Sequence, residues 1–161
     1  MTDNVALIEF KQGVRMLRDS HPHNALEHFR KAVDLDQHNP YYISFVGVSL
    51  ARAERKWEPA LKLCELALSM KRNEAQLYLN LAEVYTSAGQ REEALIILDR
   101  ALASLGPQAR IQQARLKLGR RRSPALPFLD RQNFLNRYLG VLRHRLLSWT
   151  SSSHSPLLHS S

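Results

Sequence analysis

Small residues recur every 34 or 35 positions in this sequence, and this recurrence constrains the fold more than any other feature. The recurring sets are Gly13, Gly47 and Ala82, then Ala25, Ala60 and Ala94, and then Ala32, Ala67 and Ala101. Bulky side chains stand between them at matching offsets, as at Phe29 and Leu98. A period near 34 residues with a paired-helix pattern is typical of a helical solenoid, in which each unit buries its apolar face against the next.

The small residues also predict where the two helices of each unit cross. Gly13, Gly47 and Ala82 fall in the expected first helices, and Ala25, Ala60 and Ala94 fall in the second. Small side chains let two backbones approach closely, while the bulky residues beside them fill the remaining space. We therefore expect six antiparallel helices, over residues 4–18, 23–36, 40–54, 57–71, 74–88 and 91–105.

A seventh helix is expected over residues 107–118, because Pro107 suits a first helical turn. Ile111, Ala114 and Leu118 would line its inner side, so the helix would cap the end of the solenoid. The expected segments are a solenoid with its cap over 1–119, a basic linker and amphipathic helix over 120–149, and a disordered Ser-rich tail over 150–161.

The third unit, AQLYLNLAEVYTSAGQREEALIILDRALASL, resembles the tetratricopeptide repeat (TPR) family. The residues that carry the resemblance are Tyr78, Leu81, Ala82, Tyr85, Gly89, Ala94, Leu98 and Ala101. The first unit departs from the family pattern near Glu9 and Gln12, and the second has an insertion in its turn, ERKWEP. The tail is similar to tails of small bacterial proteins of this family. The resemblance implies an all-α, right-handed solenoid of three helix pairs that acts as a non-enzymatic protein-binding scaffold or adaptor.

The same resemblance implies a concave, peptide-binding groove formed by the first helix of each unit. In that register the groove residues are Val14, Leu17, Arg18, Tyr41, Ser44, Val48, Arg52, Gln76, Leu79, Asn80 and Glu83. Phe10 and Phe45 either join the groove or belong to the core. Some TPR co-chaperones clamp a terminal carboxylate with Lys and Asn in these helices. The matching positions here are mostly Phe10, Val14, Ser44 and Val48, so that activity is not implied.

Charge divides the chain into two parts. Residues 1–106 carry 13 basic and 14 acidic residues, whereas residues 107–161 carry 10 basic residues and one acid, Asp130. Such a field attracts acidic surfaces without altering the fold of the neutral part. The single cysteine, Cys64, excludes an intrachain disulfide. Neither a signal peptide nor an apolar run of membrane-spanning length is evident, so we expect a cytoplasmic protein.

The basic segment ends in an expected amphipathic helix over about 130–148. Its apolar stripe is Leu135, Leu139, Leu142 and Leu146, and the basic patch around it is Arg120, Arg121, Arg122, Arg131, Arg137, Arg143 and Arg145. Burying each leucine contributes roughly 1.5–3 kcal/mol, so the stripe should dock. The alternatives are this chain's own solenoid, an acidic partner protein, or an anionic membrane surface. Nucleic acid is disfavoured because aromatic residues are few and scattered there.

The sequence gives no support to catalysis. His21, His23 and His28 lack the accompanying ligands of a metal site, and Cys64 occupies a core position. No Gly-rich phosphate loop or nucleophile elbow is present. We therefore expect no cofactor, no metal and no enzyme activity. The expected function is an adaptor that binds a helical or extended segment. The alternatives are a chaperone for a secreted or aggregation-prone client, or a membrane tether that uses the basic helix, and the oligomeric state is left open.

Overall fold

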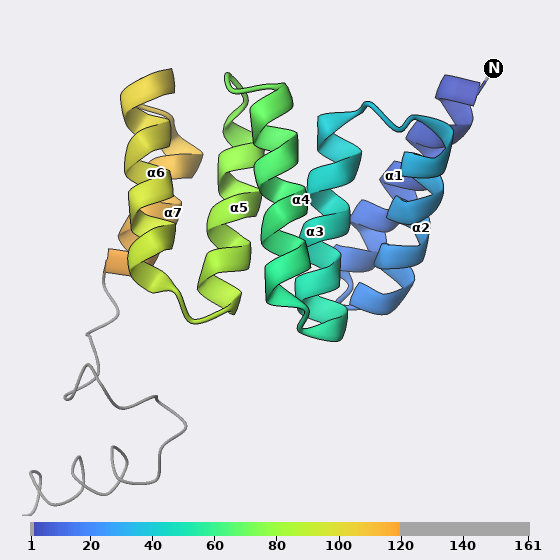
Figure 1. Cartoon of the computed structure of the whole chain (residues 1–161), viewed down its shortest axis with the longest axis horizontal. Coiled ribbons are helices and arrows are strands. Elements are labelled where there is room, and N and C mark those ends of the chain that lie inside the picture. Colours follow the sequence, from blue (N-terminus) through green and yellow to red (C-terminus); the bar gives the residue numbers. More distant parts are fainter. Residues whose placement is uncertain (1, 120–161) are drawn as a thin grey trace, which may run out of the picture. The chain divides into compact units, whose positions relative to one another are not determined.

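The computed structural model describes residues 2–119, which fold into helices packed side by side in sequence order (Figure 1). The elements are α1 (Thr2–Arg18), α2 (Pro22–Leu35), α3 (Pro40–Glu54), α4 (Trp57–Met70), α5 (Ala75–Ser87), α6 (Arg91–Leu105) and α7 (Ala109–Gly119). No strand occurs in this range. The chain divides into two units, Met1–Arg120 and Arg121–Ser161. The all-α solenoid of three helix pairs followed by a further helix is thus confirmed, whereas the expected C-terminal helix lies outside the described residues.

Local signals in the sequence explain where the helices begin. Pro22 and Pro40 occupy the first positions of α2 and α3, where a missing backbone N–H costs nothing. Asn39 precedes α3, and its side-chain oxygen accepts a hydrogen bond from the Tyr41 backbone N–H at 3.1 Å. The seventh helix begins two residues later than Pro107 suggests, because the first helical hydrogen bond of α7 runs from the Gln112 N–H to the Gln108 carbonyl.

The helix crossings are as close as the small residues predict. A methyl group added at Gly47 would lie 2.8 Å from the Ala60 carbonyl oxygen and 2.8 Å from the Cys64 sulfur. At Gly13 it would lie 2.7 Å from the ring of Phe29. The alanines of the two other recurring sets are all fully buried: Ala25, Ala60, Ala94, Ala32, Ala67 and Ala101. Larger side chains at these positions would separate the helices of a pair.

The first pair joins the second through four aromatic rings. Phe10 of α1 contacts Phe29 of α2 and both Tyr42 and Phe45 of α3, with ring centroids 4.9–5.5 Å apart. Phe29 also contacts Phe45, at 5.2 Å. Phe10 and Phe45 are half-buried, so they contribute to the core while keeping part of each ring exposed. We call these four residues the aromatic cluster.

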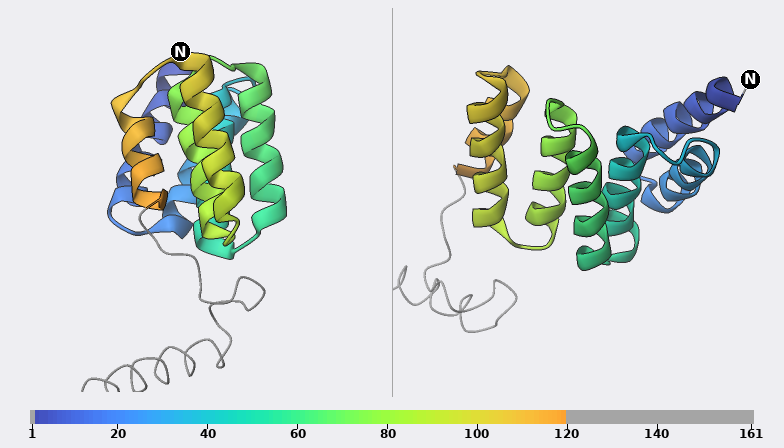
Figure 2. Two further views of the ribbon diagram at one scale, coloured as in Figure 1. Left: turned by 90° about the vertical axis from the view of Figure 1, so that its left-hand side faces the viewer. Right: turned by 45° about the horizontal axis from the view of Figure 1, so that its top comes forward.

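The last helix is fixed to the solenoid by apolar and polar contacts. Ile111 is fully buried, and Ala114 and Leu118 pack on the same core, as the sequence predicts for a cap. Arg91, at the start of α6, donates from Nε and Nη2 to the Leu118 carbonyl at 2.9 and 2.5 Å. Arg115 forms an ion pair with Asp99 of α6. Helix α7 therefore lies alongside α6 (Figure 2) and also contacts α5.

Candidate functional site

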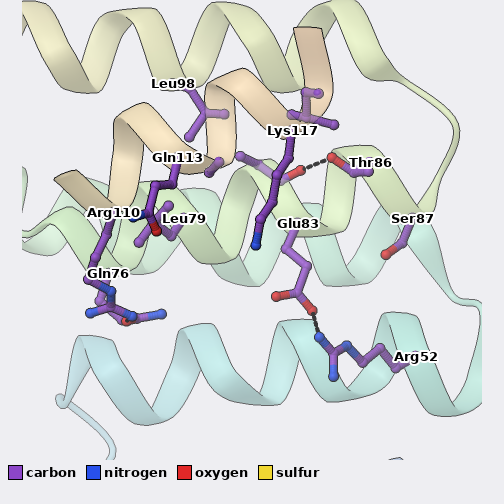
Figure 3. Close-up of a pocket in the computed structure, with 13 residues that line it drawn as sticks. Arg52, Gln76, Leu79, Glu83, Thr86, Ser87, Leu98, Arg110, Gln113 and Lys117 are labelled. Carbon is purple, nitrogen blue, oxygen red and sulfur yellow. Dashed lines mark hydrogen bonds and ion pairs between the residues drawn. The ribbon is translucent and has the colours of Figure 1, made fainter. Parts of the chain in front are cut away.

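A cavity of about 480 Å³ opens between α3, α5 and α7 (Figure 3). Its size lies within the usual range for binding pockets. It is lined by Arg52, Gln76, Leu79, Ala82, Glu83, Thr86, Ser87, Leu98, Arg110, Gln113, Ala114, Lys117 and Leu118. The apolar residues of the lining that stay half-buried, and so keep part of each side chain exposed, are Leu79, Ala114 and Leu118, which we call the apolar floor. The polar and charged side chains come from the more exposed surfaces of the three helices.

Positive charge exceeds negative charge in this cavity. Arg52 of α3 forms an ion pair with Glu83 of α5, its Nη2 lying 2.5 Å from the Glu83 Oε1 atom. Arg110 of α7 donates from Nη2 to the side-chain oxygen of Gln76 at 2.7 Å, and no carboxylate among residues 2–119 is paired with it. Lys117 points into the cavity (Figure 3) and has no ion-pair or hydrogen-bond partner among residues 2–119. We call Arg110 and Lys117 the cationic rim.

A chain of hydrogen bonds connects this rim to the interior. Beyond the Arg110 contact, the Gln76 amide donates to the Asn80 side-chain oxygen at 2.7 Å. The Asn80 amide donates in turn to the Ser44 hydroxyl oxygen at 2.9 Å, and that hydroxyl donates to the Tyr41 carbonyl at 2.9 Å. Asn80 and Ser44 are buried, so the geometry of this chain is fixed by packing on both sides.

The structure brings together some of the sequence-predicted groove residues. Arg52, Gln76, Leu79 and Glu83 all line the cavity. Val14 and Leu17 are half-buried on α1, Arg18 is exposed near its end, and none of the three lines the cavity.

Tyr41 is also outside the cavity, where it packs near Lys71, whose ammonium lies 5.5 Å from the ring centroid. Burial, followed by the hydrogen bond to Glu74, raises the pKa of the Tyr41 hydroxyl above its ordinary value. Tyr41 therefore belongs to a polar contact between α3 and the α4–α5 turn.

Three predicted groove residues need correction. Ser44, Val48 and Asn80 are 0, 1 and 2 % exposed, so their side chains do not reach a surface that a peptide could contact. The register places them on the first helices correctly, but neighbouring helices pack over them. Ser44 and Asn80 act instead as links in the hydrogen-bond chain.

The contribution of α7 to the cavity was not predicted, because the sequence pattern indicated only a cap there. Arg110, Gln113 and Lys117 are spaced by three and four residues, the spacing of one helix face, and they flank the buried apolar side. That polar stripe was the available signal. The stripe indicates a binding surface only in combination with the position of α7, which faces α5 across the cavity.

The described residues contain no cluster of three or more metal-ligating side chains. His28 contacts the Glu9 carboxylate at 2.7 Å, which links α1 to α2. Burial raises the pKa of the Cys64 thiol to about 12, and its sulfur donates to the Ser44 carbonyl at 3.5 Å. Such a thiol is a packing group with little reactivity. No helix within residues 2–119 has the length and apolar character needed to cross a membrane.

Two sets of predicted site residues lie outside the described residues. They are the apolar stripe of Leu135, Leu139, Leu142 and Leu146, and the basic patch of Arg120, Arg121, Arg122, Arg131, Arg137, Arg143 and Arg145.

Comparisons with known proteins agree with this architecture. Residues 51–118 match the sequence profile of the tetratricopeptide repeat family. Solved structures with a similar fold include the first TPR domain of human RPAP3 (20 % identity, TM-score 0.61, covering 73 % of this chain and 91 % of that one). The TPR domain of Arabidopsis OM64 has 15 % identity and a TM-score of 0.61, and covers 74 % and 98 % of the two chains.

The TPR2B domain of yeast Sti1, solved as a complex with pHsp70, has 23 % identity and a TM-score of 0.59, and covers 76 % and 99 % of the two chains. A search among curated proteins gave no match. At these identities, the solved structures establish the shared fold.

Proposed function

We propose that this tetratricopeptide repeat protein is a non-enzymatic adaptor that binds a segment of another protein in the cavity between α3, α5 and α7. The observation that carries the proposal is the cavity itself, which combines an apolar floor with exposed polar groups from three helices. An apolar floor binds a side chain by burial, and the surrounding polar groups fix its orientation.

Two of the similar solved structures support the same class of ligand. The TPR2B domain of yeast Sti1 is described as a complex with pHsp70, and the second TPR domain of human RPAP3 as a complex with an HSP70 peptide. Protein segments are thus bound by other chains of this fold. The cavity here uses its own side chains, so the identity of the segment has to be found by experiment.

A peptide-display selection with the purified full-length chain tests the proposal. We expect peptides to be enriched, and Gln113→Trp to weaken the binding of a selected peptide by at least about tenfold because the indole fills the cavity. Gln112→Trp is the matched control, since Gln112 is exposed on the same helix and does not line the cavity. Failure to enrich any peptide, or equal binding to both variants, would refute the proposal.

A further inference from the structure

We propose that the cationic rim of α7 makes the cavity specific for an acidic protein segment and excludes the chain's own basic C-terminal segment. This inference rests on the proposed function and adds the chemistry of the ligand. Its evidence is the charge of the cavity, the ammonium of Lys117, which has no partner among residues 2–119, and the way in which Arg110 is held.

The balance of charge comes first. Among the lining residues the cations are Arg52, Arg110 and Lys117, and the single carboxylate is Glu83. The Arg52–Glu83 ion pair neutralises one cation and leaves the rim uncompensated. A positive cleft beside low-dielectric protein concentrates anions and repels cations. An acidic side chain would complete the pairing that the described residues leave open.

The surroundings of Lys117 explain why a carboxylate is favoured over a neutral group. The ammonium faces a cavity whose apolar floor is Leu79, Ala114 and Leu118, so a ligand that covers this floor also removes water from the cation. A charged donor deprived of water needs a hydrogen-bonding anion. A segment with an apolar residue next to Asp or Glu satisfies the floor and the rim together.

Hydrogen bonds hold the Arg110 side chain in a defined position before any ligand binds. Gln76 accepts its hydrogen bond at 2.7 Å, and Gln76 is itself held by the buried Asn80. Side chains that are ordered before binding lose less conformational entropy when the ligand arrives. The hydrogen-bond chain through Asn80 and Ser44 therefore supports the specificity of the rim although neither residue reaches the surface.

The charge of the cavity also bears on whether the chain's own C-terminal segment enters it. Residues 107–161 contain 10 basic residues and one acid, and two of those basic residues are the rim itself. A basic segment entering the cavity would place like charges together, which disfavours its role as a lid over this site. The proposed ligand is therefore an acidic segment supplied by another protein.

Parallel peptide-display selections test this inference. With the full-length wild type we expect the enriched peptides to be rich in Asp and Glu beside an apolar residue. With Arg110→Glu/Lys117→Glu that acidic enrichment should disappear, and the best wild-type peptide should bind at least about tenfold more weakly. The matched control is Lys31→Glu/Arg100→Glu, which makes the same change of charge on α2 and α6 and should keep the wild-type preference.

Three further probes separate the possible sources of negative charge and the possible occupants. An amidated C-terminus should bind as well as a free one, since the inference assigns the rim to side-chain carboxylates. Vesicles containing phosphatidylserine should not displace the peptide. A synthetic peptide of residues 130–149, DRQNFLNRYLGVLRHRLLSW, should fail to compete on the wild type and should compete on the charge-reversed variant.

The outcomes distinguish the two proposals. Enrichment of neutral or basic peptides that Gln113→Trp excludes would leave the proposed function standing and overturn the acidic preference. Competition by the 130–149 peptide on the wild type, or displacement by the vesicles, would overturn the inference as well. Failure to enrich any peptide would refute both. Circular dichroism melting of each variant checks that the helices are retained.

Discussion

The two ends of the solenoid use equivalent repeat positions for different purposes. At the N-terminal end the aromatic cluster fills the space between the first two units, and its rings touch at 4.9–5.5 Å. At the C-terminal end the corresponding space is the cavity of about 480 Å³ with its cationic rim. Val48 and Glu83 are 35 residues apart in equivalent positions, yet Val48 is buried and Glu83 pairs with Arg52 at the cavity. Whether the residue at a given repeat position is buried in the core or lines the cavity therefore depends on the helix that packs beside it.

This comparison predicts that stability and binding can be changed separately. Phe29→Ala removes a fully buried ring that contacts Phe10 and Phe45. We expect it to lower the free energy of unfolding by about 3–5 kcal/mol, because it leaves a cavity in the aromatic cluster. Peptide affinity measured at a temperature where the variant remains folded should not change. Urea denaturation and titration calorimetry provide the two readouts.

Ile96→Ala serves as the control, since Ile96 is 65 % exposed and its truncation should change stability by less than about 0.5 kcal/mol. A loss of peptide affinity in folded Phe29→Ala would mean that the two ends are coupled. Stability at the N-terminal end and binding at the C-terminal end would then depend on each other.

The hydrogen-bond chain from Arg110 to Ser44 should contribute both to stability and to peptide binding. Asn80→Ala should cost about 1–3 kcal/mol, because it leaves buried polar groups unpaired. It should also weaken acidic-peptide binding, since Gln76 loses the partner that orders it. Gln113→Ala removes an exposed amide from the same cavity and should leave stability within about 0.5 kcal/mol of the wild type. Equal stability of the two variants in urea denaturation would show that the buried chain is energetically unimportant.

Cys64 reports how far water is excluded from the contact between α3 and α4. Its pKa is raised from 9.0 to about 12, first by burial and then by the carboxylates of Glu83 and Glu65. Because the folded pKa exceeds the unfolded one, this group's stabilisation is complete below pH 9 and is lost as the pH rises toward 12. Stability should fall by about 1.4 kcal/mol between about pH 8 and 10 on this account alone.

Cys64→Ala should flatten that dependence, although it lowers stability at neutral pH. Tyr41, whose pKa burial also raises, contributes in the same direction and is present in both proteins. Identical slopes above pH 9 for wild type and Cys64→Ala would contradict a water-free environment for the thiol.

The sequence predicted the fold well because its signals are local and repeated. Gly47 and Ala60 lie at a crossing, as their spacing indicates, and α3 and α6 have the predicted bounds. The site was predicted less well because exposure depends on contacts between units. Asn80 sits on the correct helix but under its neighbours, and Lys117 became part of the site only through the approach of α7 to α5. Periodicity carries no information about either contact.

Substituting Glu83 should change stability little and should test directly whether the charge of the cavity controls binding. Among residues 2–119 Glu83 is the single carboxylate that lines the cavity, and its pairing with Arg52 is partly exposed. Glu83→Gln should therefore change the free energy of unfolding by no more than about 1 kcal/mol. It frees the Arg52 guanidinium and removes the negative charge that opposes an acidic ligand. Affinity for an acidic peptide should rise about threefold and weaken again with added salt.

The paired measurement is Glu58→Gln, which removes a carboxylate that is paired with Lys62 on the exposed surface of α4. It should leave peptide affinity unchanged, so a rise in both variants would reflect net charge alone. If Glu83→Gln instead weakened the acidic peptide, Glu83 would be a ligand-binding acceptor. The cavity would then favour ligands with hydrogen-bond donors. The two ends of the solenoid would differ in shape, and the cavity would have no preference for negatively charged ligands.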